Sequence, residues 1–244
     1  MSYYIQIKDE QIPVVVRNYR NSNTIKLFFK GSTLNISKPI RLKNEKIHQM
    51  IQNYQEELYR EYKKILLVEE KNKKHWINGE EILYRGEKFL IQRQITSNKE
   101  IRIAIEEDNK KIQIFIPSCK IEERQIKEGI DKKIKQLFKT NTITILKERL
   151  PYWSKITKIC YQSFQVRDAV SKFGSCKPVT RELYFSARLI MLPKDKIDAV
   201  IVHELCHIIY KNHSSNFYNL VKQYIPNYDE ISQWLKKNSK EILF

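Results

Sequence analysis

The chain is poor in the residues that interrupt or cross-link a fold. Its 244 residues include only 5 glycines, 7 prolines and 4 cysteines, and no apolar run approaches the ~20 residues that span a bilayer. No two cysteines have the C-x-x-C spacing of zinc ribbons and redox motifs, and the first residues do not resemble a signal peptide. These absences disfavour a disulfide scaffold and a membrane protein. They predict a cytoplasmic protein with reduced thiols.

Acidic residues are scarce beside basic ones. The counts are 28 Asp and Glu against 45 Lys and Arg, for a formal charge of +17, while the 41% apolar content is that of a folded chain. Such an excess can attract nucleic-acid phosphates. The basic residues are spread along the whole chain, however, and most are lysines, which lack the bidentate fork of arginine. We therefore interpret the charge first as a bias of composition.

Two stretches follow the same plan of two strands and a helix. In each, apolar and polar residues alternate across a polar turn, a proline ends the second strand, and a helical period follows. The predicted elements are strands at Thr24–Phe29 and Thr33–Ile36 with a helix at Lys43–Leu67, then strands at Ile101–Ile105 and Ile112–Ile116 with a helix from about Glu122 to Leu150. The similarity indicates either an internal repeat or a chance recurrence of a common arrangement.

The rest of the chain completes an α+β protein. Asn78-Gly79 and Arg85-Gly86 predict hairpin turns within Trp76–Leu90. After Pro151, the pattern predicts strands at Gln165–Phe173 and Leu183–Leu192, a turn-rich Gly174–Thr180 between them, and helices from Lys194 onward. We expect a β-rich N-terminal half, with hairpins and long helices, packed on a helical C-terminal half. The expected regions are 1–75, 76–150 and 151–244.

Three of the five histidines lie between positions 203 and 213, in the sequence His203-Glu204-Leu205-Cys206-His207 followed by His213. The apolar pattern of Lys194–Tyr210 predicts a helix, on which residues four apart project side by side. His203 and His207 can therefore bind one zinc ion at ~2.0–2.1 Å. Glu204 can take a proton from water that the metal activates, which makes it the expected general base.

The third ligand is His213 or a carboxylate from a later helix. His213 follows His207 at the metzincin spacing, but Tyr210 replaces the metzincin glycine and no methionine follows for a Met-turn. Asn212 tolerates a left-handed conformation and can make the turn instead. Glu230 and Asp229 are the alternatives under a gluzincin plan. We favour His213, because a short tether costs little loop-closure entropy.

Several neighbours are weaker candidates. Cys206 lies inside the motif and is expected to pack rather than to bind metal. Cys176 can approach the site, although a structural thiol is the simpler interpretation. Four tyrosines can act as oxyanion donors, and the sequence does not select among Tyr210, Tyr218, Tyr224 and Tyr228.

The C-terminal third resembles the YgjP-like metallopeptidase-type proteins, relatives of the SprT-like zincins. The resemblance covers about residues 165–228 and is carried by Arg167, Phe173-Gly174-Ser175-Cys176, Leu189–Pro193, Val202–His207 and Asn212–Phe217. Phe173 stands where that family has tryptophan. The resemblance implies a zincin-like C-terminal domain with His203, His207 and His213 as zinc ligands and Glu204 as general base.

The expected function is zinc-dependent hydrolysis of amide bonds, with one Zn²⁺ per chain and a peptide or protein as substrate. A metal-dependent nucleotide phosphoanhydride hydrolase is the first alternative, although no phosphate-binding glycine motif is present. A DNA-associated SprT-like protease is the second, since nucleic acid is a weakly supported partner. We expect no membrane partner, and the sequence leaves the oligomeric state open.

Overall fold

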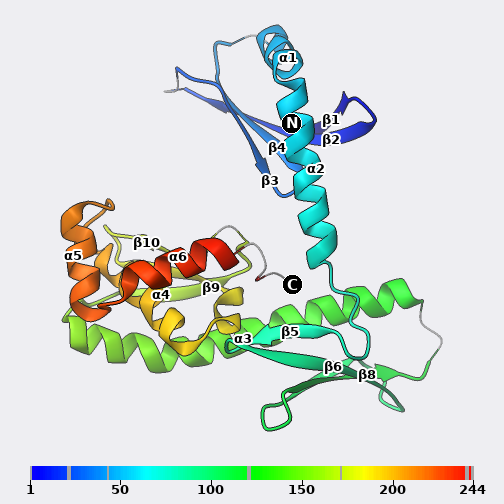
Figure 1. The fold of residues 1–244 in the computed structure, drawn as a ribbon, viewed down its shortest axis with the longest axis vertical. Coiled ribbons are helices and arrows are strands. Elements are labelled where there is room, and N and C mark those ends of the chain that lie inside the picture. Colours follow the sequence, from blue (N-terminus) through cyan, green and yellow to red (C-terminus); the bar gives the residue numbers. More distant parts are fainter. Residues whose placement is uncertain are drawn as a thin grey trace. The chain divides into compact units, whose positions relative to one another are not determined.

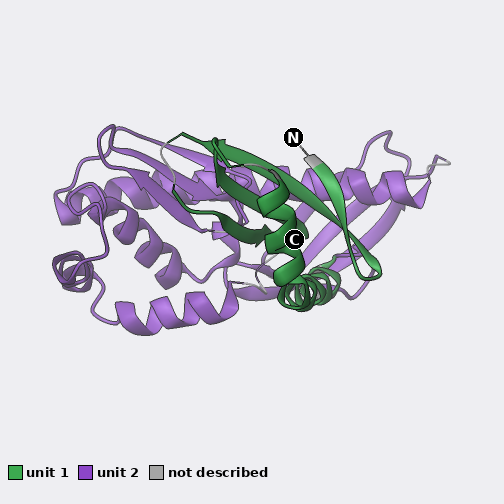
Figure 2. Cartoon of the chain, turned by 90° about the horizontal axis from the view of Figure 1, so that it is seen from above, with its two compact units in different colours: residues 1–73 green, residues 74–244 purple. Residues whose placement is uncertain are grey.

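A computed structural model of the chain describes residues 2–20, 23–42, 44–119, 122–170, 172–239 and 242. The fold is of the predicted α+β class, with three sheets and six α-helices in the described part (Figure 1). Its contacts divide into two compact units, residues 1–73 and 74–244 (Figure 2). Among the described residues, no helix is long and apolar enough to cross a bilayer.

The first unit is a four-stranded sheet with two helices. Its strands are β1 (Ser2–Ile7), β2 (Glu10–Tyr19), β3 (Lys26–Lys30) and β4 (Thr33–Pro39), in the order β1-β2-β4-β3 with β2 and β4 parallel. The helices are α1 (Asn44–Asn53) and α2 (Gln55–Asn72). Alternate strand residues bury one face of the sheet, and the helices pack against it in one apolar core that includes Ile12, Val14, Leu34, Ile36, Ile47, Ile51, Leu58 and Tyr62.

The long helix predicted at Lys43–Leu67 is two helices. Lys43 itself lies outside the described residues. Tyr54 separates α1 from α2 with φ −105° and ψ 17°, outside the helical region. Hydrogen bonds still cross the junction, since Tyr54 N–H donates to the Met50 carbonyl at 3.0 Å and Leu58 N–H donates to Tyr54 at 2.9 Å. The interruption is therefore local. The apolar period continues across Tyr54, so the sequence pattern does not indicate a break there.

The second unit begins with a sheet of the same topology. Its strands are β5 (Glu81–Tyr84), β6 (Glu87–Thr96), β7 (Arg102–Glu106) and β8 (Lys111–Pro117), in the order β5-β6-β8-β7 with β6 and β8 parallel. The repeated plan predicted from the sequence is thus present, and it also includes the preceding hairpin in both units. Arg85 and Gly86 both have positive φ, as a two-residue turn between twisted strands requires.

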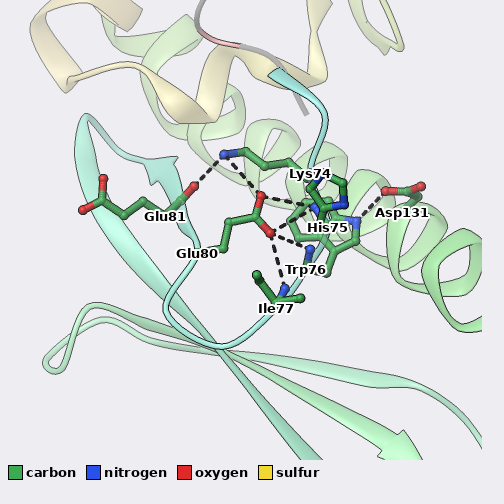
Figure 3. A network of polar contacts seen from close by, with 7 residues as sticks. All are labelled: Lys74, His75, Trp76, Ile77, Glu80, Glu81 and Asp131. Atoms are coloured by element: carbon green, nitrogen blue, oxygen red, sulfur yellow. Dashed lines mark hydrogen bonds and ion pairs between the residues drawn. The ribbon is translucent and has the colours of Figure 1, made fainter. Parts of the chain in front are cut away.

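A polar network fixes the start of this unit (Figure 3). The Glu80 carboxylate accepts hydrogen bonds from the backbone N–H groups of His75, Trp76 and Ile77. The fully buried Trp76 has a left-handed backbone, with φ 57°, and its indole N–H donates to Asp131 at 2.6 Å. The network offsets the strain of that backbone and anchors the segment to the helix that carries Asp131.

Helix α3 (Glu123–Thr157) forms the long axis of the second unit (Figure 1). It covers the β5–β8 sheet and extends to the C-terminal elements. The sequence predicted its end near Leu150, before Pro151, and this is wrong. The helix continues through Pro151, because Leu150, Trp153 and Thr157 are buried on its last turns and packing outweighs the hydrogen bond that proline lacks.

The C-terminal elements carry the histidine motif. They are β9 (Ser163–Arg167), β10 (Gly174–Lys177), β11 (Glu182–Ser186), the 3₁₀ helix η1 (Ala187–Met191), α4 (Lys194–Cys206), α5 (Ser215–Tyr224) and α6 (Tyr228–Asn238), with sheet order β10-β11-β9. Two predictions are corrected here. The segment Gly174–Thr180 begins with strand β10, and the predicted strand Leu183–Leu192 is a short strand followed by η1, whose residues are all buried and so show no period of two.

The two predicted regions 76–150 and 151–244 share one continuous core. Residues from the β5–β8 sheet, α3, η1 and α4 all contribute to it. The β5–β6 turn also contacts the end of η1, just before α4, since Arg85 N–H donates to Ile190 O at 2.7 Å and Gly86 N–H donates to Met191 O at 3.0 Å. A Cβ at Gly86 would lie 2.5 Å from Pro193 Cγ. The first sheet of this unit therefore helps to position α4. The three-part domain division itself stays a prediction.

A buried ion pair joins α3 to α4. The Arg149 guanidinium donates two hydrogen bonds to the Asp198 carboxylate, both of 2.7 Å, and both side chains are about nine-tenths buried. We expect Arg149→Lys to lower the free energy of unfolding by about 1–2 kcal/mol, because a lysine keeps the charge and loses the bidentate geometry. Denaturant unfolding measures the change. The matched control is Arg124→Lys, whose partner Glu128 is exposed on the same helix, and an equal loss in both variants would contradict the assignment.

Candidate metal centre

Helix α4 presents the first two histidines. It begins after Pro193, which suits a helix start, and Asp195 lies in its first turn. His203 and His207 lie one turn apart, and α4 ends at Cys206 rather than at Tyr210, with His207 as its C-cap residue. No residue from 207 to 213 has a positive φ, so the expectation of a left-handed turn at Asn212 is wrong. Turn hydrogen bonds from Ile208, Ile209 and Tyr210 redirect the chain instead.

The three histidines converge through their Nε2 atoms. His207 Nε2 lies 3.1 Å from His203 Nε2 and 3.1 Å from His213 Nε2, and the third side of the triangle is 3.2 Å. These separations are close to those of imidazole nitrogens that share one tetrahedral ion at ~2.0–2.1 Å. Among the described residues, these three form the one cluster of histidine, cysteine and carboxylate groups with ligand atoms this close together.

The outer nitrogens of two imidazoles are held by hydrogen bonds. His207 Nδ1 lies 3.0 Å from the Tyr210 carbonyl oxygen, which only accepts, so Nδ1 carries the proton and Nε2 keeps its lone pair. His203 Nδ1 lies 2.6 Å from the Tyr228 hydroxyl. Burial, together with the neighbouring imidazoles, lowers the pKa of His203 to about 3, and burial also lowers the pKa of His207. Both shifts favour the neutral imidazole, which is the form that binds metal.

Phe217 forms the floor of the histidine cluster. Its ring centroid lies 4.9 Å from that of His203, 4.5 Å from that of His207 and 5.0 Å from that of His213, and it is fully buried. Ser214 caps α5 by accepting from the Phe217 N–H at 3.4 Å. The segment from His213 to Phe217 thus supplies one imidazole, one helix cap and the ring that supports all three imidazoles. From the sequence, Phe217 could be named only as part of the stretch Asn212–Phe217 that carries the family resemblance.

Glu204 is a buried carboxylate with an unused acceptor. Its side chain is 5% exposed, and Oε2 has no hydrogen-bond partner among the described residues. Burial raises the pKa of Glu204 to about 8, and the nearby Lys172 opposes this rise. Strand β10 passes directly over it, because a Cβ built on Gly174 would lie 2.7 Å from Glu204 Cγ and 2.7 Å from Oε1. Only glycine leaves the carboxylate this room.

One pocket of about 630 Å³ joins these groups. The three histidines, Glu204 and Tyr228 line it together with Gly174 and Cys176 of β10. Three lysines line it as well, Lys172, Lys211 and Lys236, while Glu204 is the one carboxylate among its lining residues. The half-buried Cys176 does reach the site, and burial and the Glu204 charge raise the pKa of its thiol to about 12.

The other candidate residues lie elsewhere or have different contacts. Asp229 forms an ion pair with Lys222 at 2.6 Å, Glu230 is exposed, and neither belongs to the metal-ligand cluster. Cys206 is fully buried in the apolar core. Of the tyrosines, Tyr218 stacks on His213 and Tyr224 Oη donates to the Thr157 carbonyl.

Two further residues that carry the family resemblance, Arg167 and Phe173, pack against neighbours. The Arg167 guanidinium lies 3.6 Å from the centroid of the Tyr184 ring. Phe173, which replaces tryptophan, packs under the Arg188 guanidinium at 5.1 Å. Arg188 is itself buried and donates to the carbonyls of Ala169, Val170, Ser239 and Ile242, so this ring supports the connection between β9 and the end of the chain.

Three imidazoles and a buried carboxylate in one pocket are a combination typical of metal-dependent hydrolases. The family can be given more narrowly. A profile described as "YgjP-like, metallopeptidase domain" matches residues 23–238, so the chain belongs to the YgjP-like metallopeptidase family. This match is wider than the resemblance visible in residues 165–228, and it reaches back into the first unit. A metallopeptidase domain implies a divalent metal ion, typically zinc.

Comparison with individual proteins adds little. One solved structure that matches the chain is the crystal structure of the metallopeptidase zymogen of Pyrococcus abyssi abylysin. Its sequence is 17% identical, and the match covers 38% of this chain and 93% of that chain with a TM-score of 0.35. A search of curated proteins found no match.

The residues present fit a divalent ion. The observation that tests the fit is the set of three Nε2 atoms within 3.2 Å of one another, with two of the outer nitrogens hydrogen-bonded to fixed partners. Imidazole nitrogens whose lone pairs point at one another repel unless a cation or a shared proton lies between them. His203, His207 and His213 are accordingly the residues that would hold the metal.

Proposed function

We propose that this protein is a zinc-dependent peptidase in which His203, His207 and His213 hold the ion and Glu204 is the general base. One observation carries the proposal: a buried carboxylate oxygen, which has no hydrogen-bond partner in the described part of the chain, lines the same pocket as three converging imidazole nitrogens. When bound, the ion would act as a Lewis acid, which polarises a peptide carbonyl and makes water a better nucleophile.

The chain's own residues would do the rest of the chemistry. Glu204 would accept the proton of the attacking water and return it to the leaving nitrogen. Burial raises the pKa of Glu204 and so makes its carboxylate a stronger base, and the positive charge of a bound ion would favour the ionised form that accepts the proton. Tyr228 and the Tyr210 carbonyl hold the imidazoles in orientation. Gly174 lets β10 approach the carboxylate, and a strand beside a metal site can position an extended substrate backbone.

The three lysines of the pocket support a second candidate. Lys172, Lys211 and Lys236 give the pocket a positive lining, which would attract an anionic group of the substrate. In a peptidase this group would be an acidic side chain or a terminal carboxylate. In the second candidate it would be a nucleoside triphosphate, hydrolysed at a phosphoanhydride by the same metal and base.

The test uses full-length protein purified without chelator or affinity tag. We expect about one zinc ion per chain, the stoichiometry of a catalytic zinc site, and loss of activity after chelation that zinc restores. Casein, a peptide library containing acidic residues and the four nucleoside triphosphates are assayed in parallel for new amino groups and for released phosphate or pyrophosphate. Amino groups alone support the peptidase. Phosphate release without peptide cleavage would overturn it in favour of the second candidate, and protein without a bound divalent metal would overturn both.

A further inference from the structure

The first unit has a sheet face that its helices leave uncovered. Strand alternation and the register place Tyr4, Tyr19 and Phe28 on the side opposite the core residues Ile12, Val14, Leu34 and Ile36. These rings are 70%, 46% and 46% exposed. Three exposed aromatic rings on one sheet face are unusual, because the large apolar surface of an aromatic side chain is normally buried in the core or in an interface.

The same face carries cations and, among the strand residues that the structure describes, no carboxylate. Arg17, Lys26 and Lys30 are exposed at positions of the same parity, with Arg17 and Lys26 on either side of Ser37 in the register. The ion pairs described within the first unit use Lys8, Lys63 and Lys73 and leave these three cations unused. The acidic Glu10 has the opposite parity and pairs with Lys63 of α2. We call the face defined by Tyr4, Arg17, Tyr19, Lys26, Phe28 and Lys30 the aromatic–basic face.

The second unit provides an internal control, because its first sheet has the same topology. Matching the registers aligns Tyr4 with Glu81, Tyr19 with Thr96 and Phe28 with Ala104. Lys30 aligns in the same way with Glu106. In that sheet Glu81 is paired with Lys88 at 2.7 Å. The second sheet keeps one of the cations, since Lys26 aligns with the exposed Arg102, but Arg17 aligns with Gln94 and no ring stands at the positions of Tyr4, Tyr19 and Phe28. The fold therefore does not require this combination of rings and cations, and the aromatic–basic face needs another explanation.

We propose that the aromatic–basic face binds single-stranded nucleic acid. Exposed rings stack on unpaired bases, and neighbouring lysine and arginine side chains neutralise the phosphates between them. An anionic membrane or an acidic protein would be attracted by the cations but would not require flat rings interleaved with them. The even spread of basic residues along the sequence conceals this face, because β-strand alternation separates Arg17, Lys26 and Lys30 from the acidic residues nearby. The proposal concerns the first unit and does not depend on the proposed peptidase activity.

The test measures the binding of the full chain to fluorescein-labelled oligothymidylate and oligouridylate of about 20 nucleotides, longer than the ~4–16 that a single stacking platform covers. We expect Phe28→Leu to weaken binding about tenfold, since one stacked base is lost, while Tyr4→Phe keeps the ring and the affinity. Lys26→Glu should weaken binding and should lower the slope of log K against log salt concentration by about the amount of one phosphate contact. The DNA and RNA arms tell which strand chemistry is preferred.

The matched control is Arg102→Glu, at the position of the second unit's sheet that corresponds to Lys26. It reverses the same charge and should leave the affinity within about twofold if the face, and not net charge, binds the strand. Thermal unfolding and zinc content should not change in any of these variants. The proposal is overturned by absence of binding at low salt, by equal affinity for duplex DNA, heparin or anionic vesicles, or by equal losses in Lys26→Glu and Arg102→Glu.

Discussion

Replacing Glu204 by glutamine is expected to reduce kcat by about 10²–10⁴-fold while the protein keeps its zinc, because the substitution removes the proton acceptor and preserves the shape of the side chain. Shape matters at this position, since Gly174 leaves the Glu204 side chain no spare room. The measurements are kcat and KM on the best substrate from the parallel screen, zinc per chain, and the midpoint of thermal unfolding. KM should change little, because the lost interaction belongs to the transition state.

Two further variants separate the general base from the metal. His207→Ala should lose zinc and activity together, because it removes one of the three converging nitrogens. Glu128→Gln, a replacement of an exposed carboxylate on α3, should change neither. Retention of full activity in Glu204→Gln would show that another group moves the proton. Loss of zinc in that variant would show instead that the carboxylate has a structural role in the metal centre.

The histidine cluster could be predicted because most of its geometry is local. On a helix, two residues four positions apart project side by side, so the spacing of His203 and His207 places both imidazoles on one face. The apolar period after Pro193 indicates that helix. His213 could be favoured from tether length alone, and the structure brings its Nε2 within 3.2 Å of the other two. Whether these residues bind metal in the protein stays a prediction, which the zinc measurement addresses.

The residues that surround the cluster could not be predicted, because their contacts are long-range. Tyr228 is 25 positions from the imidazole that it contacts, and the sequence offered four equivalent tyrosines. Gly174 looked like a glycine of a turn, and Phe217 could be named only as part of the stretch that carries the family resemblance. Only the packing of β10 and α5 against α4 gives them a relation to Glu204 and the histidines.

The errors in the fold have the same origin. Pro151 normally indicates the end of a helix, and the rule fails here because the residues after it, Trp153 and Thr157, are buried by partners far away in the chain. The strand predicted at Leu183–Leu192 contains η1, which is buried on all sides and therefore carries no period. The repeated strand plan was recognised from turns and prolines, which are local signals. The difference between the outer faces of the two sheets could be recognised only from the register of the strand pairs in the structure.

Gly174→Ala is expected to lower kcat/KM about 10²-fold although glycine takes no part in the chemistry. The added Cβ would lie 2.7 Å from Oε1 and 2.9 Å from Cδ of Glu204, closer than packed atoms approach, so the buried carboxylate must move. A displacement of about 1 Å in a catalytic group costs about this much. Zinc content should stay unchanged, since the crowded atoms belong to Glu204 and not to the histidines.

A double-mutant cycle tests whether Gly174 acts through Glu204. In the Glu204→Gln background, Gly174→Ala should cause little further loss of kcat, because the group that it displaces no longer moves a proton. Gly129→Ala is the matched control, because its Cβ would meet Ile101 Cδ1 at 2.6 Å, a similar crowding on α3 against a residue that does not line the pocket. It should change the free energy of unfolding without changing kcat. Fully additive losses in the cycle would mean that the alanine damages the pocket directly, and the role of Gly174 as a positioning residue for Glu204 would be wrong.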